Sequence, residues 1–154
     1  MLVGHCSGVI ALHSIHLLRF RAQGGLRNRY AKGEHMTRSE ALARVMDKAA
    51  QRVLSGIERP YDVALETAGE LVYLDSESES TSSWTAYLHW SEISDLVDAP
   101  GGPESEELCN SVAVEFSRTW LTLTDRREEL KQKAFMTEFD HIFRERVSQY
   151  LATH

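Results

Sequence analysis

The stretch WTAYLHWSEISDLV, residues 84–97, decides the fold of this chain. Wound as a helix at about 100° per residue, it presents apolar side chains on two opposite sides. One side carries Trp84, Tyr87 and Leu88, and the other carries Trp90, Ile93 and Val97. A helix that is apolar on both sides must be covered on both sides, whereas a domain of this size usually buries only one side of each helix. The stretch therefore predicts an additional interface, with a partner protein or with a second copy of the chain.

Two more helices are expected downstream. The run APGGP, residues 99–103, ends the helix because two prolines and two glycines cannot continue it. Apolar residues then recur at helical spacing at Leu108, Val112, Phe116, Thr119 and Leu123, and the stripe is widened by Cys109, Ala113 and Trp120. Thr124-Asp125, with Glu128 at capping-box spacing, predicts the start of a last helix of about 26 residues. Its packing seam would be Met136, Phe139, Phe143, Val147 and Tyr150.

Upstream, the first helix of the domain is expected after Thr37 or Ser39, either of which can cap it, with Glu40 completing a capping box. Its apolar stripe is Leu42, Val45, Met46, Ala49 and Val53. Gly56 is placed to end this helix in the left-handed conformation.

A second helix is expected from Pro60, which suits a first turn because its missing amide hydrogen would be unpaired there. Its apolar face would be Tyr61, Ala64, Ala68 and Leu71. The polar run 75–83 then predicts a solvated loop that ends in a helix cap at Ser82 or Ser83.

No stretch alternates apolar and polar residues long enough to predict a strand, so the expected class is all-α, a compact four- or five-helix bundle. The chain has 154 residues, 42% of them hydrophobic, which fits one ordinary soluble domain. We place that domain at residues 36–154. The two cysteines of the whole chain, Cys6 and Cys109, are too far apart in sequence to indicate a disulfide framework or a zinc site, so the expected compartment is the cytoplasm.

Residues 1–35 differ in charge from the rest, with five bases against one acid, while the remainder has twelve bases against 22 acids. An apolar run from Leu2 to Leu18 precedes these bases, which is the opposite order to a secretory signal. The run is too short and too rich in histidine to predict a membrane span. We interpret the segment as an N-terminal extension, either a leader of the transit-peptide type or the product of a start site upstream of a true start at Met36.

Acidic residues are concentrated in the middle of the chain. Between Glu58 and Glu115 fourteen acids face one base, Arg59, within a formal net charge of −6 for the whole chain. Such a surface repels nucleic acid and speeds the encounter with a basic protein, and it is interleaved with aromatic residues of the types found at binding hot spots. The predicted partner-binding residues are Tyr61, Glu66, Glu70, Trp84, Tyr87, Trp90 and Asp95. The alternative is an acidic surface over an aromatic core.

Three other features carry residue types used in catalysis or metal binding. Glu138 and His141 could share a metal, but a di-iron bundle needs a second such pair, and the helical wheel places both on the solvent face. His89 and Glu92 could form an acid–base pair, although a lone histidine in an aromatic helix is more often packed. Cys109 has acidic neighbours, which predict an inert thiol. No metal or cofactor is therefore expected.

These observations predict a non-catalytic, acidic helical protein that binds another, basic protein, in the manner of a small immunity or antitoxin-like inhibitor. Two alternatives stay open. One is a metal-dependent or ligand-binding helical enzyme that uses Glu138 and His141 with carboxylates such as Glu66 and Glu70. The other is a homodimeric scaffold. Neither a nucleic-acid partner nor a membrane partner is expected.

Overall fold

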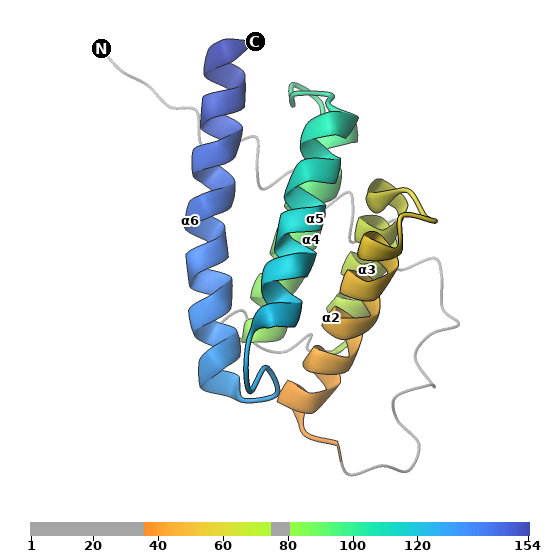
Figure 1. The fold of residues 1–154 in the computed structure, drawn as a ribbon, viewed down its shortest axis with the longest axis vertical. Coiled ribbons are helices and arrows are strands. Elements are labelled where there is room, and N and C mark those ends of the chain that lie inside the picture. Colours follow the sequence, from red (N-terminus) through yellow and green to blue (C-terminus); the bar gives the residue numbers. More distant parts are fainter. Residues whose placement is uncertain (1–35, 75–80) are drawn as a thin grey trace. The chain divides into compact units, whose positions relative to one another are not determined.

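The computed structural model describes residues 36–74 and 81–154, and within them the protein is all-α, as predicted (Figure 1). The helices of this part are α2 (Arg38–Ser55), α3 (Pro60–Leu74), α4 (Ser82–Asp98), α5 (Glu106–Thr122) and α6 (Glu129–Thr153). They belong to one compact unit, His35–His154. The predictions for residues 1–35, and those for 75–80 in the polar loop, lie outside the described residues.

Helix α4 is the central element of the bundle. It packs against α2, α3, α5 and α6, so that all the other described helices contact it. Tyr87 on one side of α4, and Trp90 and Ile93 on the other, are fully buried. The two-sided pattern of residues 84–97 correctly predicts a helix that is covered all round, but the additional interface expected from it is not needed for that cover. The cover comes from the same chain, because five packed helices can enclose one of their number.

The start and end of α2 and the start of α3 lie where the sequence predicts them. Thr37 is the N-cap of α2, and its hydroxyl accepts a hydrogen bond from the Glu40 amide while the Glu40 carboxylate accepts one from the Thr37 amide. Gly56 ends α2 with φ of 70°, a left-handed conformation that glycine adopts without steric cost. Pro60 is the first residue of α3.

Two predicted helix starts are wrong. Thr81, not Ser82 or Ser83, caps α4, and both serines are buried within its first turn. Asp125 does not cap α6, since it has φ of 55° and lies in the turn before the helix. Helix α6 begins after Glu128, which makes no side-chain capping bond. Before α4 three adjacent residues can cap a helix and Thr81 does so, whereas α6 is preceded by a turn and its N-cap is Glu128.

The core is aromatic where α4, α5 and α6 meet. Phe116 of α5 lies at its centre, with its ring centroid 5.0 Å from that of Trp90, 5.3 Å from Phe135 and 4.1 Å from Phe139. The predicted seam of α6 is confirmed, since Met136, Phe139 and Phe143 are buried while Val147 and Tyr150 pack partly against the core. In the described part of the chain no helix combines the length and the apolar character needed to cross a membrane.

Candidate functional site

The predicted partner-binding aromatic residues do not form one surface. Tyr87 and Trp90 are buried in the core, so neither can contact a partner in this fold. Trp84 is half-buried in the first turn of α4, and its ring contacts the ring of Tyr87 at a tilted angle. Tyr61 is also half-buried, but its hydroxyl reaches Asp98 at the other end of α4, which is 14 residues and about 21 Å from Trp84.

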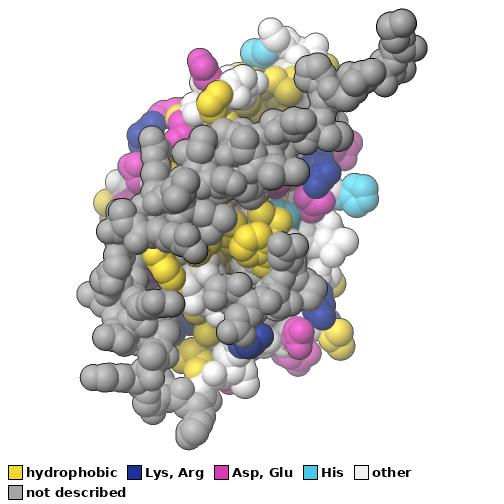
Figure 2. Space-filling model, turned by 180° about the vertical axis from the view of Figure 1, so that it is seen from behind, with side chains coloured by type: hydrophobic (Ala, Val, Ile, Leu, Met, Phe, Trp, Pro, Cys, Tyr) yellow, Lys and Arg dark blue, Asp and Glu magenta, His cyan; other side chains and the backbone are white. Residues whose placement is uncertain are grey.

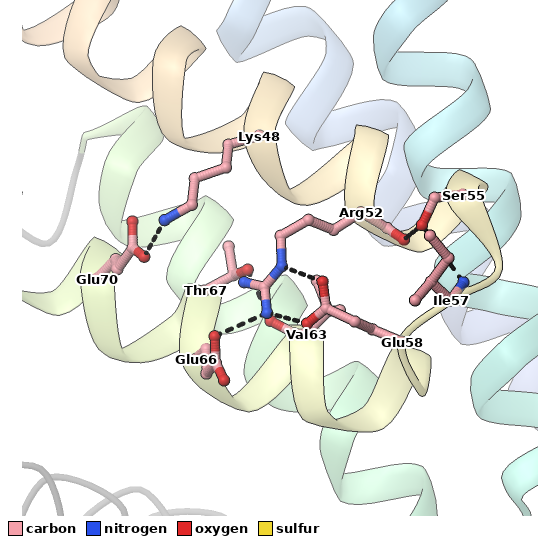
Figure 3. Close-up of polar contacts among 9 residues, drawn as sticks. All are labelled: Lys48, Arg52, Ser55, Ile57, Glu58, Val63, Glu66, Thr67 and Glu70. Carbon is pink, nitrogen blue, oxygen red and sulfur yellow. Dashed lines mark hydrogen bonds and ion pairs between the residues drawn. The ribbon is translucent and has the colours of Figure 1, made fainter.

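The predicted acidic pair on α3 is neutralised within the chain (Figure 3). Arg52 of α2 lies between Glu58 and Glu66 and binds both, with a distance of 2.8 Å from its guanidinium to Glu66. Lys48, one turn earlier, pairs with Glu70 at 2.9 Å. The hydrogen bond from Arg52 lowers the pKa of Glu58 below its usual value. These pairs thus join α3 to α2, and the two bases offset two of the three negative charges.

Bases from α2 and α6 also offset the acidic excess elsewhere. Glu115 of α5 pairs with Arg146 of α6, although the two are far apart in sequence. Where Figure 2 leaves the described residues visible, both acidic and basic side chains are seen. The counted concentration of acids in residues 58–115 is therefore not a uniformly negative surface across the described helices.

A local excess of acids is found where α3 and α5 begin and α4 ends, which is the same end of the bundle (Figure 1). We call it the acidic end, and it consists of Asp62, Asp98, Glu104, Glu106 and Glu107. All but Glu104 lie in the first or last turns of helices. The base among them is Arg59, which pairs with Glu106 and, at 3.9 Å, with Asp62.

Contacts among these residues hold the acidic end together. The Tyr61 hydroxyl donates a 2.7 Å hydrogen bond to Asp98, which joins α3 to α4. Burial, followed by that bond, raises the pKa of Tyr61 to about 12, so the hydroxyl stays protonated and donates at neutral pH. The Arg59 guanidinium lies 4.7 Å from the centre of the Tyr61 ring, in a cation–π position.

Part of this charge has a structural explanation. Asp62, Glu106 and Glu107 lie in first turns, where the helix dipole favours a carboxylate. Asp98 lies at the C-terminal end of α4, where the dipole disfavours one. Glu104 and Glu107 are exposed and form no ion pair with the residues that the structure describes. Together with Asp98, which accepts a hydrogen bond but forms no ion pair, they make three carboxylates of the acidic end that ion pairs within this part of the chain do not account for.

An exposed apolar side chain adjoins these charges. Ile57, in the turn between α2 and α3, is 88% exposed, directly before Glu58 and Arg59. The turn is held by Gly56 and by the Ser55 hydroxyl, which accepts a 3.4 Å hydrogen bond from the Ile57 amide (Figure 3). An isoleucine held outward in an ordered turn offers apolar contact area next to Glu58 and Arg59.

The predicted metal pair faces solvent, as the helical wheel indicated. Glu138 and His141 are both exposed on α6. Asp140, which lies between them in sequence, instead faces α4, where its carboxylate comes together with His89 and Glu92. The ligand atoms of these three side chains all lie within 4.8 Å of one another, which is close enough to hold one metal ion.

His89 is fixed in orientation inside the core. It is 2% exposed, and its ring meets the rings of Phe116 and Phe139 edge-on, with centroids 5.8 Å and 5.7 Å away. Its Nε2 atom donates a 2.8 Å hydrogen bond to the carbonyl oxygen of Met136. Its Nδ1 atom faces Glu92 Oε2 at 3.7 Å. The packed histidine expected from the sequence is thus also next to a carboxylate, as the acid–base hypothesis requires.

Cys109 is a buried thiol in the first turns of α5. Burial, followed by the negative charge of Glu106, raises its pKa to about 11. At pH 8 this lowers the thiolate fraction about a hundredfold relative to a thiol of ordinary pKa.

We expect iodoacetamide to leave Cys109 unmodified in the native protein and to modify it in urea, as measured by peptide mapping, with Cys6 scored separately. Rapid native modification of Cys109 would contradict this burial.

Sequence reasoning missed two groups of residues. The acidic end combines positions from three helix termini. Helices joined by short loops run antiparallel, and this rule could have placed these termini at the same end of the bundle. Asp140 was inside the quoted Glu138–His141 motif, but the direction in which it points depends on how α6 rotates against α4. That rotation is set by the packing of Phe139 and Phe143.

Comparison with known proteins does not assign a family. We find no protein-family model that the sequence matches, and neither a curated protein nor a solved structure is significantly similar to the chain. Functional inference therefore rests on the residues themselves.

Proposed function

We propose that this protein is a non-catalytic interaction protein whose acidic end binds a basic protein. The observations that support this most are two exposed carboxylates, Glu104 and Glu107, which form no ion pair with the described residues, and the 88% exposed Ile57, which lies two residues before Arg59. Exposed apolar area together with charges that attract a basic surface is the usual composition of a small docking site. An inhibitor that covers a cationic protein, as immunity proteins do, is the form of this function that fits the size and charge of the chain.

The proposal moves the binding surface away from most of the residues first expected to form it. Tyr61 remains, because it anchors Asp98 and supports Arg59 at this end. Glu70 pairs with Lys48, and Glu66 shares Arg52 with Glu58, so both contribute less attraction to a partner than unpaired carboxylates would. Complementary charge at the rim mainly raises the association rate, so binding should weaken as salt rises.

Neutralising the acidic end tests this function. In affinity capture with the full chain, we expect a basic protein to be retained at low salt and released as salt rises. The variant D62N/E104Q/E107Q should weaken this retention about tenfold, since three charge pairs at roughly 0.5 kcal/mol each give about 1.5 kcal/mol. None of these three side chains makes a short hydrogen bond within the described fold, so the fold should tolerate their replacement.

A matched control removes the same charge elsewhere. The variant E128Q/E138Q/E145Q alters exposed carboxylates on and before α6 and should retain the partner as the parent does. Ile57→Ser should also weaken retention without changing the thermal midpoint, because the side chain has no buried contacts to lose. If both triple variants lowered retention equally, binding would depend on net charge alone and the assignment to the acidic end would be wrong.

A further inference from the structure

We propose that His89, Glu92 and Asp140 form a binding site for one divalent first-row transition ion such as Zn²⁺. Two of the residues come from one face of α4, three positions apart, and the third comes from α6. Their ligand atoms lie within 4.8 Å of one another. This site is distinct from the acidic end and does not depend on the function proposed for it.

The hydrogen bonding of His89 leaves one nitrogen aimed at the carboxylates. A backbone carbonyl can only accept, so the nitrogen bonded to Met136 carries a hydrogen. In a neutral imidazole the other nitrogen, Nδ1, then has a lone pair and no hydrogen. Carbonyl bonding of the distal nitrogen is also the arrangement that orients histidine ligands in metal sites.

Electron-rich atoms therefore face one another in a buried position. The Nδ1 atom of His89 and the Oε2 atom of Glu92 are 3.7 Å apart, and neither has a hydrogen-bond partner among the residues that the structure describes. Buried polar atoms are normally satisfied, and two acceptors that face each other repel unless a positive group lies between them. A cation bound here supplies that group, and a divalent ion also balances the two carboxylates.

The dimensions fit a small ion after modest closure. Ligand atoms bound to one ion at about 2.1 Å lie roughly 3–3.5 Å from each other, so the carboxylates must move on the order of 1 Å. They are free to do so, since the side chains of Glu92 and Asp140 are 31% and 37% exposed. Asp140 also pairs with Arg144 at 3.1 Å, but that side chain is largely exposed and can be displaced.

The ligand set selects the class of ion. Imidazole nitrogen suits Zn²⁺ and its neighbours in the first transition row, whereas Mg²⁺ and Ca²⁺ prefer sites made entirely of oxygen atoms. The buried histidine lies behind the two partly exposed carboxylates, so the remaining coordination positions would face solvent. Three protein ligands with solvent in the other positions is the arrangement of an open metal site.

Calorimetric titration of the full chain, after chelator treatment, tests the site with Zn²⁺ as the probe. We expect the parent protein to bind one equivalent of Zn²⁺ at this site. The affinity for Zn²⁺ should fall at least tenfold in Glu92→Gln and in Asp140→Asn. The control variant E138Q/H141Q, which changes the exposed pair on the same helix, should bind as the parent does. Histidines in residues 1–35 are common to all these proteins, so they cannot produce a difference between them.

Nitrogen NMR of His89 provides the second readout. Zn²⁺ should shift the Nδ1 resonance while Nε2 keeps its hydrogen, and the same concentration of Mg²⁺ should leave both unchanged. Equal Zn²⁺ affinity in the parent, Glu92→Gln and Asp140→Asn would overturn the proposal. So would a His89 ring that carries hydrogens on both nitrogens throughout the titration, because the resident cation would then be a proton.

Discussion

Replacing Trp90 with alanine should lower the free energy of unfolding by about 3–5 kcal/mol, one of the largest effects expected in this chain. Trp90 is fully buried, its ring centroid lies 5.0 Å from that of Phe116, and its indole N–H donates to the Met46 sulfur at 3.2 Å. Its removal leaves a cavity between α2, α4 and α5 that close-packed helices cannot fill by relaxing. Urea denaturation followed by circular dichroism measures the loss.

Trp84→Ala is the matched control for this prediction, since it removes the same ring from a half-buried position on the same helix. We expect a loss well below that of Trp90→Ala. Sedimentation should give the same association state for both variants and the parent at a temperature where all are folded. A Trp90 variant of unchanged stability but altered self-association would instead place this residue at a dimer interface. Trp90→Phe provides a milder change if the alanine variant does not fold.

Replacing Asp47 with alanine should cost about 2–3 kcal/mol, because one carboxylate joins three segments of the chain. Asp47 of α2 accepts a 2.8 Å hydrogen bond from the indole of Trp120 in α5 and a 2.7 Å bond from Arg126 in the turn before α6. Trp120 is fully buried, so its N–H would be left without an acceptor. Thermal and urea unfolding both report this loss.

Two comparisons separate the causes of this effect. Asp47→Asn keeps an oxygen for the indole but loses the charge opposite Arg126, so we expect a smaller loss than in Asp47→Ala. Glu115→Gln breaks an ion pair between α5 and α6 without orphaning a buried donor, and should cost at most about 1 kcal/mol. If Asp47→Ala were no worse than Glu115→Gln, the Trp120 hydrogen bond would contribute little to stability.

Helix positions were predictable because their signals are local. The capping box at Thr37 and Glu40, the left-handed glycine at position 56 and the first-turn Pro60 each depend on a few neighbouring residues. The predicted caps of α4 and α6 were wrong, because three adjacent residues can cap α4 and because Asp125 adopts a left-handed turn that moves the start of α6 to Glu128.

The candidate sites were less predictable, because a charge count along the chain ignores what lies opposite in space. Glu66 and Glu70 belong to the acidic middle of the sequence, yet Arg52 and Lys48 from an earlier helix compensate them. The acidic end joins the start of α3 to the end of α4 and the start of α5, which follow tens of residues later, and its members could be grouped only once the helices were placed.

By itself, then, the order of residues determined that the described chain is helical, where α2 and α3 begin, where α2 and α4 end, and that residues 84–97 must be covered on two sides. Periodicity and capping act within a few residues, so they can be read along the chain. The tertiary structure alone decided that the cover comes from the same chain, which carboxylates are compensated, and that Asp140 rather than Glu138 or His141 approaches His89. Those outcomes depend on how whole helices rotate and pack against one another, which no local pattern specifies.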